Sequence, residues 1–470
     1  MTFSSWWRRP VSRSIILIGA MAVLTVGGQL AMPRTPPAAS TVVVPISSLS
    51  LVCPTLPADS PGLSIAVKGA LLAGAHSASL QLQARQPVNL NITAHGVTST
   101  AVRHSAAAVF SASGSAASQL MADASIAGSS STTRGYATYS CQPPTSSQWL
   151  VGGASTVGRT DVLSIANVDD TTADVDLEVW SESGKSSARS LHGIEIPPRS
   201  VKQISLAQLE PDRAMFAVHV TANGGQVTSA ILSRGQRALS SLGIDVISPV
   251  SSPLASDLVG VIPNGTTNAV LGLLSPGSPT AARVSLVTSD GVYPLAGAEN
   301  LTLDADKLLR IPLPDAALVG DVMVLVQADA EILSGITSDI AIKGGPDLAS
   351  EAMLSPIYRA ASVTVDPTVS EATALLYSDV ATTVTARVRT GSSTTTQRLR
   401  LKAGVVTRAK LVGGAGQPHL LSILPDVDGV VSGSVLFTRA SVGMAASSVE
   451  PLVSVRGYVA VPPVEPDVSR

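Results

Sequence analysis

The chain has 470 residues, of which 45% are hydrophobic and 14% are charged, and its 31 basic and 33 acidic side chains leave a net charge of -2. This balance gives no electrostatic reason to expect a nucleic-acid partner, and the length is enough for about three or four domains. Aromatic residues make up only 3%, and Arg outnumbers Lys by 24 to 7, an excess that we attribute to overall composition and not to a basic patch.

The N-terminal residues carry a signal for export or anchoring. Arg8, Arg9 and Arg13 precede residues 14–32, a stretch of 19 residues without a charged side chain. This length lies between the about 20 residues of a spanning helix and the about 7–15 of a cleavable signal core. We expect a retained single-span anchor, with a cleaved signal peptide as the alternative. In both cases the arginines stay in the cytoplasm, so residues 41–470 lie outside, at the cell membrane or secreted.

Cys53 and Cys141 are the two cysteines of the chain. In an exported protein a disulfide between them is the default, because the surroundings are oxidising. The alternative is a pair of free buried thiols. No histidine or further cysteine stands near them in the sequence, so we expect neither a metal site nor a cofactor.

Internal similarity predicts that the chain repeats at intervals of roughly a hundred residues. The tetrapeptide Leu-Ser-Ile-Ala stands at 63–66 and again at 163–166, an offset of 100. Further matches keep the same order along the chain, namely Leu-Val at 51–52, 150–151 and 258–259, and an apolar segment at 227–231, 332–336 and 430–434. The predicted organisation is a cytoplasmic tip, membrane or signal segment and linker at 1–40, followed by four units at 41–143, 144–248, 249–355 and 356–470.

Alternating apolar and polar residues predict strands with one buried face in every unit, as in residues 173–179. Short strands with turns about every 8–12 residues favour an all-β chain of tandem immunoglobulin-like antiparallel sandwiches, about four in number. A β-propeller is the alternative, although its blades are only about 40–50 residues long. Residues 105–133, which are rich in Ala and Ser, are expected to form a short helix or a loop.

The sequence contains no recognisable motif for catalysis, phosphate binding or metal binding. The six histidines are not spaced as a zinc or catalytic pair, and no serine has a recognisable base partner. Gly184-Lys185-Ser186 lacks the upstream glycine of a phosphate loop and predicts a hairpin turn. We therefore expect no catalytic residue and no metal site.

Two tryptophans beyond the N-terminal segment are candidates for stacking on a sugar ring. Trp149 begins a predicted strand, and we expect it in a core or as a wedge between domains. Trp180 follows an alternating strand and is expected on an exposed face, which makes it the candidate contact for a glycan.

A distinctive stretch contains Cys-Gln-Pro at 141–143, Trp-Leu-Val-Gly-Gly at 149–153 and Gly-Arg at 158–159. In these residues the chain resembles an uncharacterised family of exported actinobacterial proteins, which share an N-terminal membrane segment and a Cys–Pro–Trp–Gly–Gly stretch. The resemblance covers most of the chain after residue 40. It implies location and architecture, and it carries no activity.

Taken together, these features predict a non-catalytic scaffold, adhesion or spacing protein of the bacterial cell envelope, anchored through residues 14–32. An envelope glycan-binding module is one alternative. An enzyme of envelope polysaccharide processing, with its site between domains, is the other. The expected partners are the membrane and an envelope glycan or protein, without nucleic acid.

Overall fold

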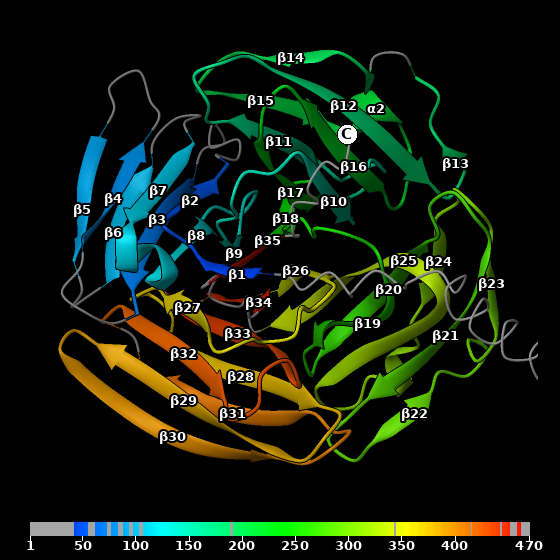
Figure 1. The fold of residues 1–470 in the computed structure, drawn as a ribbon. Helices are drawn as coiled ribbons and strands as arrows, with labels where there is room; N and C mark the ends of the chain where they lie inside the picture. The colour runs from blue at the N-terminus through cyan, green and yellow to red at the C-terminus, as the bar shows by residue number, and fades with distance from the viewer. Residues whose placement is uncertain are drawn as a thin grey trace, which may run out of the picture. The chain divides into compact units, whose positions relative to one another are not determined.

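A computed structural model describes residues 42–54, 62–72, 77–82, 88–93, 97–102, 107–188, 191–342, 345–414, 416–441, 444–451 and 458–461. The described chain is all-β, which confirms the predicted class, and its sheets are antiparallel (Figure 1). Its helical segments are short, namely α2 (Leu206–Leu209), η1 (Gly114–Gln119) and η3 (Asp315–Ala317). The predicted membrane segment, residues 14–32, lies outside the described residues. None of the described helices has the length and apolar character that crossing a membrane requires.

The chain forms two compact bodies. In the smaller body β1 (Val42–Pro45) pairs antiparallel with β35 (Tyr458–Val461), so segments from the two ends of the chain meet. The larger body contains residues 46–457 and holds the other sheets of the described chain.

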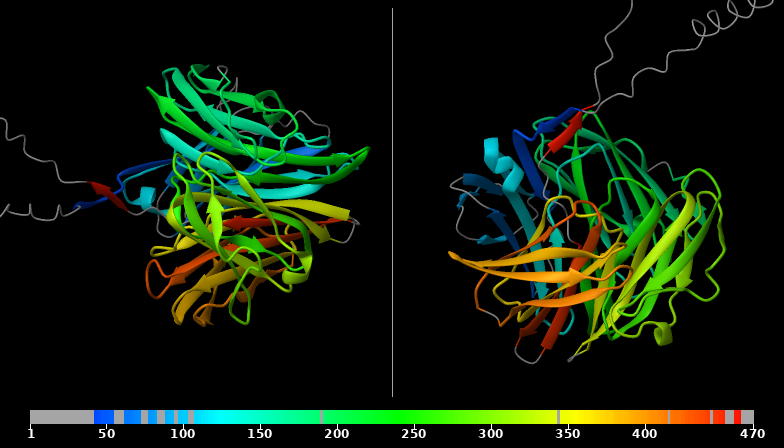
Figure 2. Two further views of the ribbon diagram at one scale, coloured as in Figure 1. Left: turned by 90° about the vertical axis from the view of Figure 1, so that its right-hand side faces the viewer. Right: turned by 60° about the horizontal axis from the view of Figure 1, so that its bottom comes forward.

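The larger body is built from sheets that pack in pairs (Figures 1 and 2). In the first sheet pair one sheet has the order β2 (Ser48–Cys53), β7 (Ala108–Ser113), β4 (Ser77–Leu82), β5 (Val88–Thr93), and the other has the order β6 (Val97–Val102), β3 (Leu63–Leu71), β8 (Leu120–Gly128), β9 (Gly135–Ser140). The two sheets share a core that includes Leu80, Phe110 and Ile126. Alternation places these side chains inside, while Ser79 and Gln81 of β4 face solvent.

The second and fourth sheet pairs are built in the same way, each around its own core. One sheet of the second pair has the order β10 (Ser147–Val151), β16 (Ala217–Asn223), β12 (Ala173–Ser181), β13 (Gly184–Lys185), with β14 (Ile194–Ile196) also beside β12. Its other sheet has the order β15 (Ser200–Ser205), β11 (Val162–Asn167), β17 (Val227–Arg237), β18 (Ser240–Ile247). The fourth pair has β27 (Ala361–Val365), β32 (His419–Pro425), β29 (Thr382–Thr390) and β30 (Ser393–Leu401) in one sheet, and β31 (Thr407–Gly413), β28 (Glu371–Ser378), β33 (Val431–Ser441) and β34 (Met444–Pro451) in the other.

The third sheet pair differs because one long strand, β25 (Val322–Ile342), runs through both of its layers. Its N-terminal half pairs with β19 (Leu254–Ile262) and β21 (Thr280–Val287), and its C-terminal half pairs with β20 (Thr266–Leu274) and β26 (Gly345–Ala352). The remaining strands of this pair are β22 (Val292–Pro294), β23 (Leu301–Leu303) and β24 (Leu309–Pro312).

The sheet pairs share one strand order. Numbered one to eight along the chain, the strands of the first and fourth pairs read 1-6-3-4 in one sheet and 5-2-7-8 in the other. The second pair places both β13 and β14 beside its third strand, and in the third pair strands six and seven are joined as β25. The matched residues 63–66 and 163–166 lie on second strands, and 227–231 and 332–336 lie on seventh strands. These matched segments therefore occupy equivalent places in the shared strand order.

Most of the Ala- and Ser-rich region forms strands, so the expectation of a short helix or loop there is largely wrong. Strands β7 and β8 flank η1, which is a single short 3-10 segment. Every second residue of β8 from Leu120 to Ile126 lies in the first core, and the small Ala122 and Ala124 fill two of these positions. Alanine hides the alternation in the sequence because it is common on both sides of a strand.

The predicted disulfide between Cys53 and Cys141 is confirmed. Cys53 ends β2, Cys141 directly follows β9, and both are buried in the first core. Beside them Val52 and Gln142 exchange two backbone hydrogen bonds of 2.8 and 3.1 Å. By the chain-entropy model, closing a loop over a separation of 88 residues contributes about 4–5 kcal/mol to stability.

The last strands of the four sheet pairs, β9, β18, β26 and β34, lie against one another and are called the central strands below. β9 contacts β18, β18 contacts β26, β26 contacts β34, and β34 contacts β9. Because the fourth pair contacts the first, the pairs close on themselves. The arrangement is therefore not a linear array, in which each pair would contact its sequence neighbours alone.

Buried carboxylates bind the sheet pairs to one another. Asp347 of β26 accepts hydrogen bonds from the backbone N–H of Ile244 in the second pair (3.0 Å) and of Tyr136 in the first (3.2 Å). Asp123 of β8 accepts from the backbone N–H and the hydroxyl of Thr364 in the fourth pair, both at 2.7 Å. Burial raises the pKa of Asp123, and the charge of the fully buried Lys68, which lies opposite it in the β3–β8 register, opposes this rise.

Two glycines allow the central strands to approach this closely. A methyl group on Gly243 would lie 2.2 Å from the backbone N of Leu348, and one on Gly135 would lie 2.6 Å from the backbone N of Ile244. Both residues have positive φ, +126° and +153°. Residues with a side chain rarely adopt this conformation, so glycine is required for two reasons.

We predict that Gly243→Ala destabilises the larger body. Forcing a methyl group against backbone costs about 1–3 kcal/mol beyond the strain of a positive φ. Gly297→Ala is the control, because its φ is +82° and no atom lies within 4 Å of the added methyl group. Chemical denaturation measures both variants, and equal losses of unfolding free energy would contradict the close packing of β18 on β26.

Asp245 on β18 gives a pH dependence to the same interface. Burial raises the pKa of Asp245 well above its ordinary value, and the Asp347 carboxylate raises it further. The folded chain therefore holds this proton more tightly than the unfolded chain. The contribution of Asp245 to the free energy of unfolding therefore falls as pH rises from the pKa of about 3.9 in the unfolded chain toward the higher pKa in the folded chain.

We predict that Asp245→Asn makes the loss of stability with rising pH less steep above the unfolded pKa of about 3.9. The amide oxygen retains an acceptor for the Ser350 N–H, and the titration is removed. Asp304→Asn, at a largely exposed carboxylate, is the control. Denaturation at several pH values gives the slopes, and an unchanged slope in the Asp245 variant would count against a raised pKa.

Candidate functional site

The outer face of the sheet formed by β10, β16 and β12 gathers aromatic and titratable side chains. In the strand register Trp149 of β10 lies opposite His219 of β16, and His219 lies opposite Glu178 of β12. Trp180 follows Glu178 by two residues and so points to the same face. These three strands of alternating residues thus bring together side chains that are far apart in the sequence.

Both tryptophans lie in a cluster between the second and third sheet pairs. Their rings stack at a centroid distance of 5.4 Å, and the cluster includes Met215, Leu274 and Leu308. Trp149 is buried in this cluster, which agrees with the expectation of a position in a core or as a wedge between domains. The expected exposed face of Trp180 is wrong, because the side chain is 1% exposed and its Nε1–H donates to Asp306 Oδ1 at 2.9 Å.

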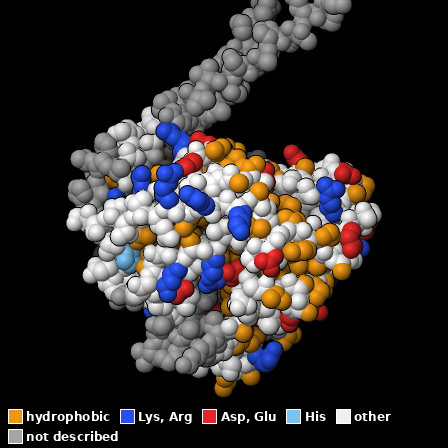
Figure 3. Space-filling view, turned by 90° about the horizontal axis from the view of Figure 1, so that it is seen from below, with side chains coloured by type: hydrophobic (Ala, Val, Ile, Leu, Met, Phe, Trp, Pro, Cys, Tyr) orange, Lys and Arg blue, Asp and Glu red, His pale blue; other side chains and the backbone are white. Residues whose placement is uncertain are grey.

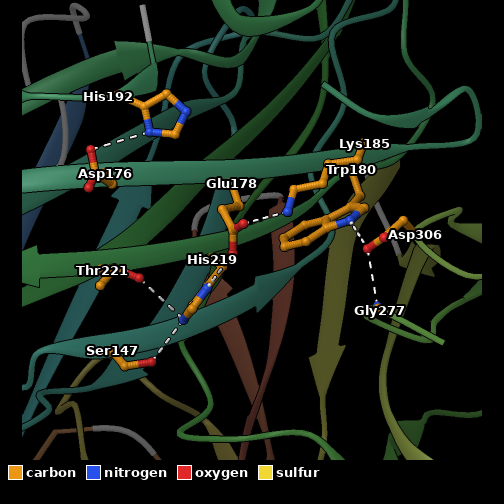
Figure 4. Close-up of polar contacts among 10 residues, drawn as sticks. All are labelled: Ser147, Asp176, Glu178, Trp180, Lys185, His192, His219, Thr221, Gly277 and Asp306. Atoms are coloured by element: carbon orange, nitrogen blue, oxygen red, sulfur yellow. Dashed lines mark hydrogen bonds and ion pairs between the residues drawn. The ribbon is translucent and has the colours of Figure 1, made fainter. Parts of the chain in front are cut away.

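The third sheet pair covers Trp180, and this is why alternation within β12 could not reveal its burial. Asp306 lies between β23 and β24, and its Oδ1 also accepts the backbone N–H of Gly277 at 3.2 Å. The indole is therefore held by a hydrogen bond as well as by apolar packing (Figure 4). As placed, Trp180 offers no free ring face to a sugar.

A hydrogen-bonded chain runs across the same face through Ser147, His219 and Glu178 (Figure 4). Ser147 Oγ lies 2.9 Å from His219 Nε2, and His219 Nδ1 lies 3.1 Å from Glu178 Oε2. Thr221 Oγ1 is a longer second neighbour of Nε2, at 3.5 Å. Lys185 Nζ donates to the other oxygen of Glu178.

The electrostatics favour an ionised Glu178 and a fixed imidazole. Partial burial raises the pKa of Glu178, but hydrogen bonds and charge from Lys185 and His219 lower it more, so the net pKa lies below its ordinary value. The Trp149 indole stacks on the His219 ring at 3.8 Å with an interplanar angle of 6°. When Nδ1–H donates to Glu178, Nε2 is free to accept the Ser147 hydroxyl proton, which is the order of groups in a Ser–His–acid nucleophile.

Sequence analysis did not predict the hydrogen-bonded series of Ser147, His219 and Glu178. The three residues are 31 and 41 positions apart along the sequence, on three strands, and no local motif links them. Only the register of β10 and β12 on β16 places them together. Ser147 therefore has a neighbouring imidazole in the fold although no base partner is recognisable in the sequence.

Other polar side chains near this sheet face take no part in the hydrogen bonds among Ser147, His219 and Glu178. His192 Nδ1 lies 3.3 Å from Asp176 Oδ1, and both side chains are exposed. Gly184 and Lys185 form β13, which turns back onto β12 as the predicted hairpin. Among the described residues, no group of three or more His, Cys, Asp or Glu side chains is arranged to hold a metal ion.

The chain belongs to the Family of unknown function (DUF5719), whose model matches residues 97–411, about two thirds of the sequence. The match includes the complete second and third sheet pairs, and with them Trp149, Trp180 and the hydrogen-bonded chain. The prediction of an uncharacterised family is confirmed. The shared stretch at 141–153 and the actinobacterial source stay predictions. No curated protein matches the chain.

Proposed function

We propose that this member of the family is a non-catalytic scaffold or adhesion protein of the bacterial cell envelope. Residues 14–32 hold it in the membrane, as a single span, and residues 41–470 lie outside. The three arginines before that segment support this orientation, and the Cys53–Cys141 disulfide supports an oxidising compartment. Secretion after cleavage of the segment is the alternative form of the same proposal.

The proposed architecture is four immunoglobulin-like units at 41–143, 144–248, 249–355 and 356–470. In the immunoglobulin fold strands B and E pair in one sheet, and strands C and F pair in the other. Strands two and five, and strands three and six, make the corresponding pairs here. Strand seven departs from that fold, because it joins strand two and not strand six. The likeness therefore concerns strands two, three, five and six.

The hydrogen bonds to buried Asp123 and Asp347 are the observation that carries the scaffold role. Each bond joins backbone of one sheet pair to a carboxylate of another, and a buried N–H that loses its acceptor costs about 1–3 kcal/mol. Four units held in this way resist relative movement. A rigid body presents fixed outer faces, as a spacing or adhesion protein requires.

Retention of envelope material tests this function. The detergent-solubilised chain is incubated with isolated envelope fractions, and bound polymer or protein is recovered and weighed by mass spectrometry. We expect a partner that is retained with unchanged mass. Gly243→Ala, which loosens the central strands, should retain less. Recovery of a shortened or chemically modified glycan would contradict a non-catalytic role.

A second function is favoured by the Ser147–His219–Glu178 chain, namely hydrolysis of an ester on an envelope polysaccharide. Ser147 Oγ would attack the acyl carbon while His219 Nε2 takes the hydroxyl proton, and ionised Glu178 would stabilise the resulting imidazolium. The bond from the acyl carbon to the sugar oxygen then breaks, and that oxygen leaves as an alcohol with the proton from His219 Nε2. Water, deprotonated by Nε2, attacks the acyl-Ser147 ester, which releases the carboxylic acid and returns the proton to Ser147 Oγ. This site lies beside the contact between the second and third sheet pairs.

A fluorophosphonate probe, which labels activated serines, distinguishes the two functions. The hydrolase requires labelling of the wild type and loss of labelling in Ser147→Ala. Ser146→Ala is the matched control, since Ser146 contributes only a backbone carbonyl, to Ala222 N–H at 2.9 Å. An unlabelled wild-type chain would contradict the hydrolase and leave the scaffold.

A further inference from the structure

The fourth sheet pair carries a concentration of positive charge. No Asp or Glu occurs between Asp379 and Asp426, whereas seven basic residues do, namely Arg387, Arg389, Arg398, Arg400, Lys402, Arg408 and Lys410. Five of them lie on or directly after the β29–β30 hairpin. The expectation that arginine is spread without a patch is therefore wrong.

The hairpin places these arginines on one face in a regular pattern. Four successive pairs on this face each join one threonine to one arginine across the two strands, namely Thr383 with Arg400, Thr385 with Arg398, Thr396 with Arg387, and Thr394 with Arg389. Arginines two residues apart on a strand are separated by about 7 Å, and diagonal neighbours across strands by about 7–8 Å. The arginines thus form an oblique row with hydroxyl groups beside it.

Two of the arginines in this row are occupied within the protein, and two are free. Arg389 donates to the carbonyl groups of Leu71 and Leu72 in the first sheet pair. Arg398 pairs with Asp426 at 2.9 Å. Arg387 and Arg400 are exposed, and within the described chain neither has a carboxylate or hydrogen-bond partner.

This arrangement is unfavourable for the protein alone. Like charges on one face of a sheet repel each other, and Asp426 is the single carboxylate that pairs with the row in the described chain. An anion that bridges several guanidinium groups removes the repulsion. Arginine binds carboxylate and phosphate through two parallel hydrogen bonds, and these charge-assisted bonds are about twice as strong as neutral ones.

We propose that the Thr/Arg face of β29 and β30 binds an anionic glycan, a polymer of sugars that carry carboxylate or phosphate groups. The guanidinium groups pair with the anionic substituents, and the threonine hydroxyls bond the sugar hydroxyls. Viewed from below, Lys and Arg side chains gather on one side of the molecule (Figure 3).

The composition of the sheet favours a glycan over other polyanions. Strands β27, β32, β29 and β30 contain no Phe, Tyr or Trp. Binding of single-stranded nucleic acid relies on aromatic side chains that stack on bases, and this face has none. The exposed large apolar side chains of the described chain do not include a residue of β29 or β30, so the face lacks the apolar anchors of a membrane-surface protein.

This inference deepens the proposed scaffold function by naming what the scaffold holds, and it rests on that function for the location of the glycan. Binding in vitro does not depend on location. Absence of glycan binding by the Thr/Arg face in vitro would contradict this inference, whereas failure of the protein to retain envelope material would contradict the scaffold function. The two results can therefore be distinguished.

The test compares two double variants of the full-length chain in detergent, with polygalacturonate as the anionic probe and dextran as the neutral one. Arg387→Gln with Arg400→Gln removes two charges from the row. Arg237→Gln with Arg310→Gln removes two exposed charges elsewhere and is the matched control. Biolayer interferometry at about 0.05 M salt, where screening is weak, measures the affinities.

We expect the wild type to bind polygalacturonate and not dextran, and the R387Q/R400Q variant to bind about tenfold more weakly because two charge-assisted contacts are lost. The R237Q/R310Q control should stay within about twofold, since exposed charges elsewhere contribute little. Equal losses in the two variants would overturn the site. Stronger arginine-dependent binding of oligo(dT), or of anionic phosphatidylglycerol vesicles, would overturn the choice of a glycan.

Discussion

The close approach of the four central strands is the constraint on which the rest of the larger body depends. Each of these strands ends a sheet, and an exposed sheet edge would present unpaired N–H and C=O groups to other chains. Here the edges cover one another, and Asp347 accepts N–H groups from both β9 and β18. The approach requires glycine at 135 and 243, where any side chain would meet backbone.

Closure at the centre decides which surfaces remain for function. One face of each sheet faces the core of its own pair, and the last strands face the centre, so the outer sheet faces are left. On the second sheet pair the neighbouring third pair covers part of this face and buries Trp180. On the fourth pair the hairpin of β29 and β30 stays exposed and carries the arginine row. The surfaces available to a partner therefore follow from the packing between pairs.

Local patterns in the sequence predicted the features that are local in the structure. Alternation in residues 173–179 predicted β12, and internal similarity predicted the equivalent strands. The disulfide followed from two cysteines and an expected export signal. Features that need strand register were missed. Ser147, His219 and Glu178 meet only through pairing on β16, and the threonine–arginine pairs appear only when β29 is aligned with β30.

Features that depend on the packing between sheet pairs were also missed. Trp180 was expected on an exposed face because alternation describes one strand and not its neighbours. The joining of strands six and seven into β25, and the contact of β34 with β9, likewise leave no periodic signal in the sequence. Asp123 and Lys68 are charged residues on strands whose other face lines the core. By itself, this alternation of charged and apolar residues predicts that the charged side chains face solvent, whereas both are buried.

Native-state hydrogen exchange is the most direct measurement of whether the four sheet pairs form one closed body. Amides such as those of Ile244, Tyr136 and Thr364, which donate across the contacts between pairs, can be followed by mass spectrometry at increasing denaturant. The closed arrangement predicts that they exchange only by global unfolding, with the same opening free energy as the cores. Exchange of any central strand by a separate opening of much lower free energy would contradict it.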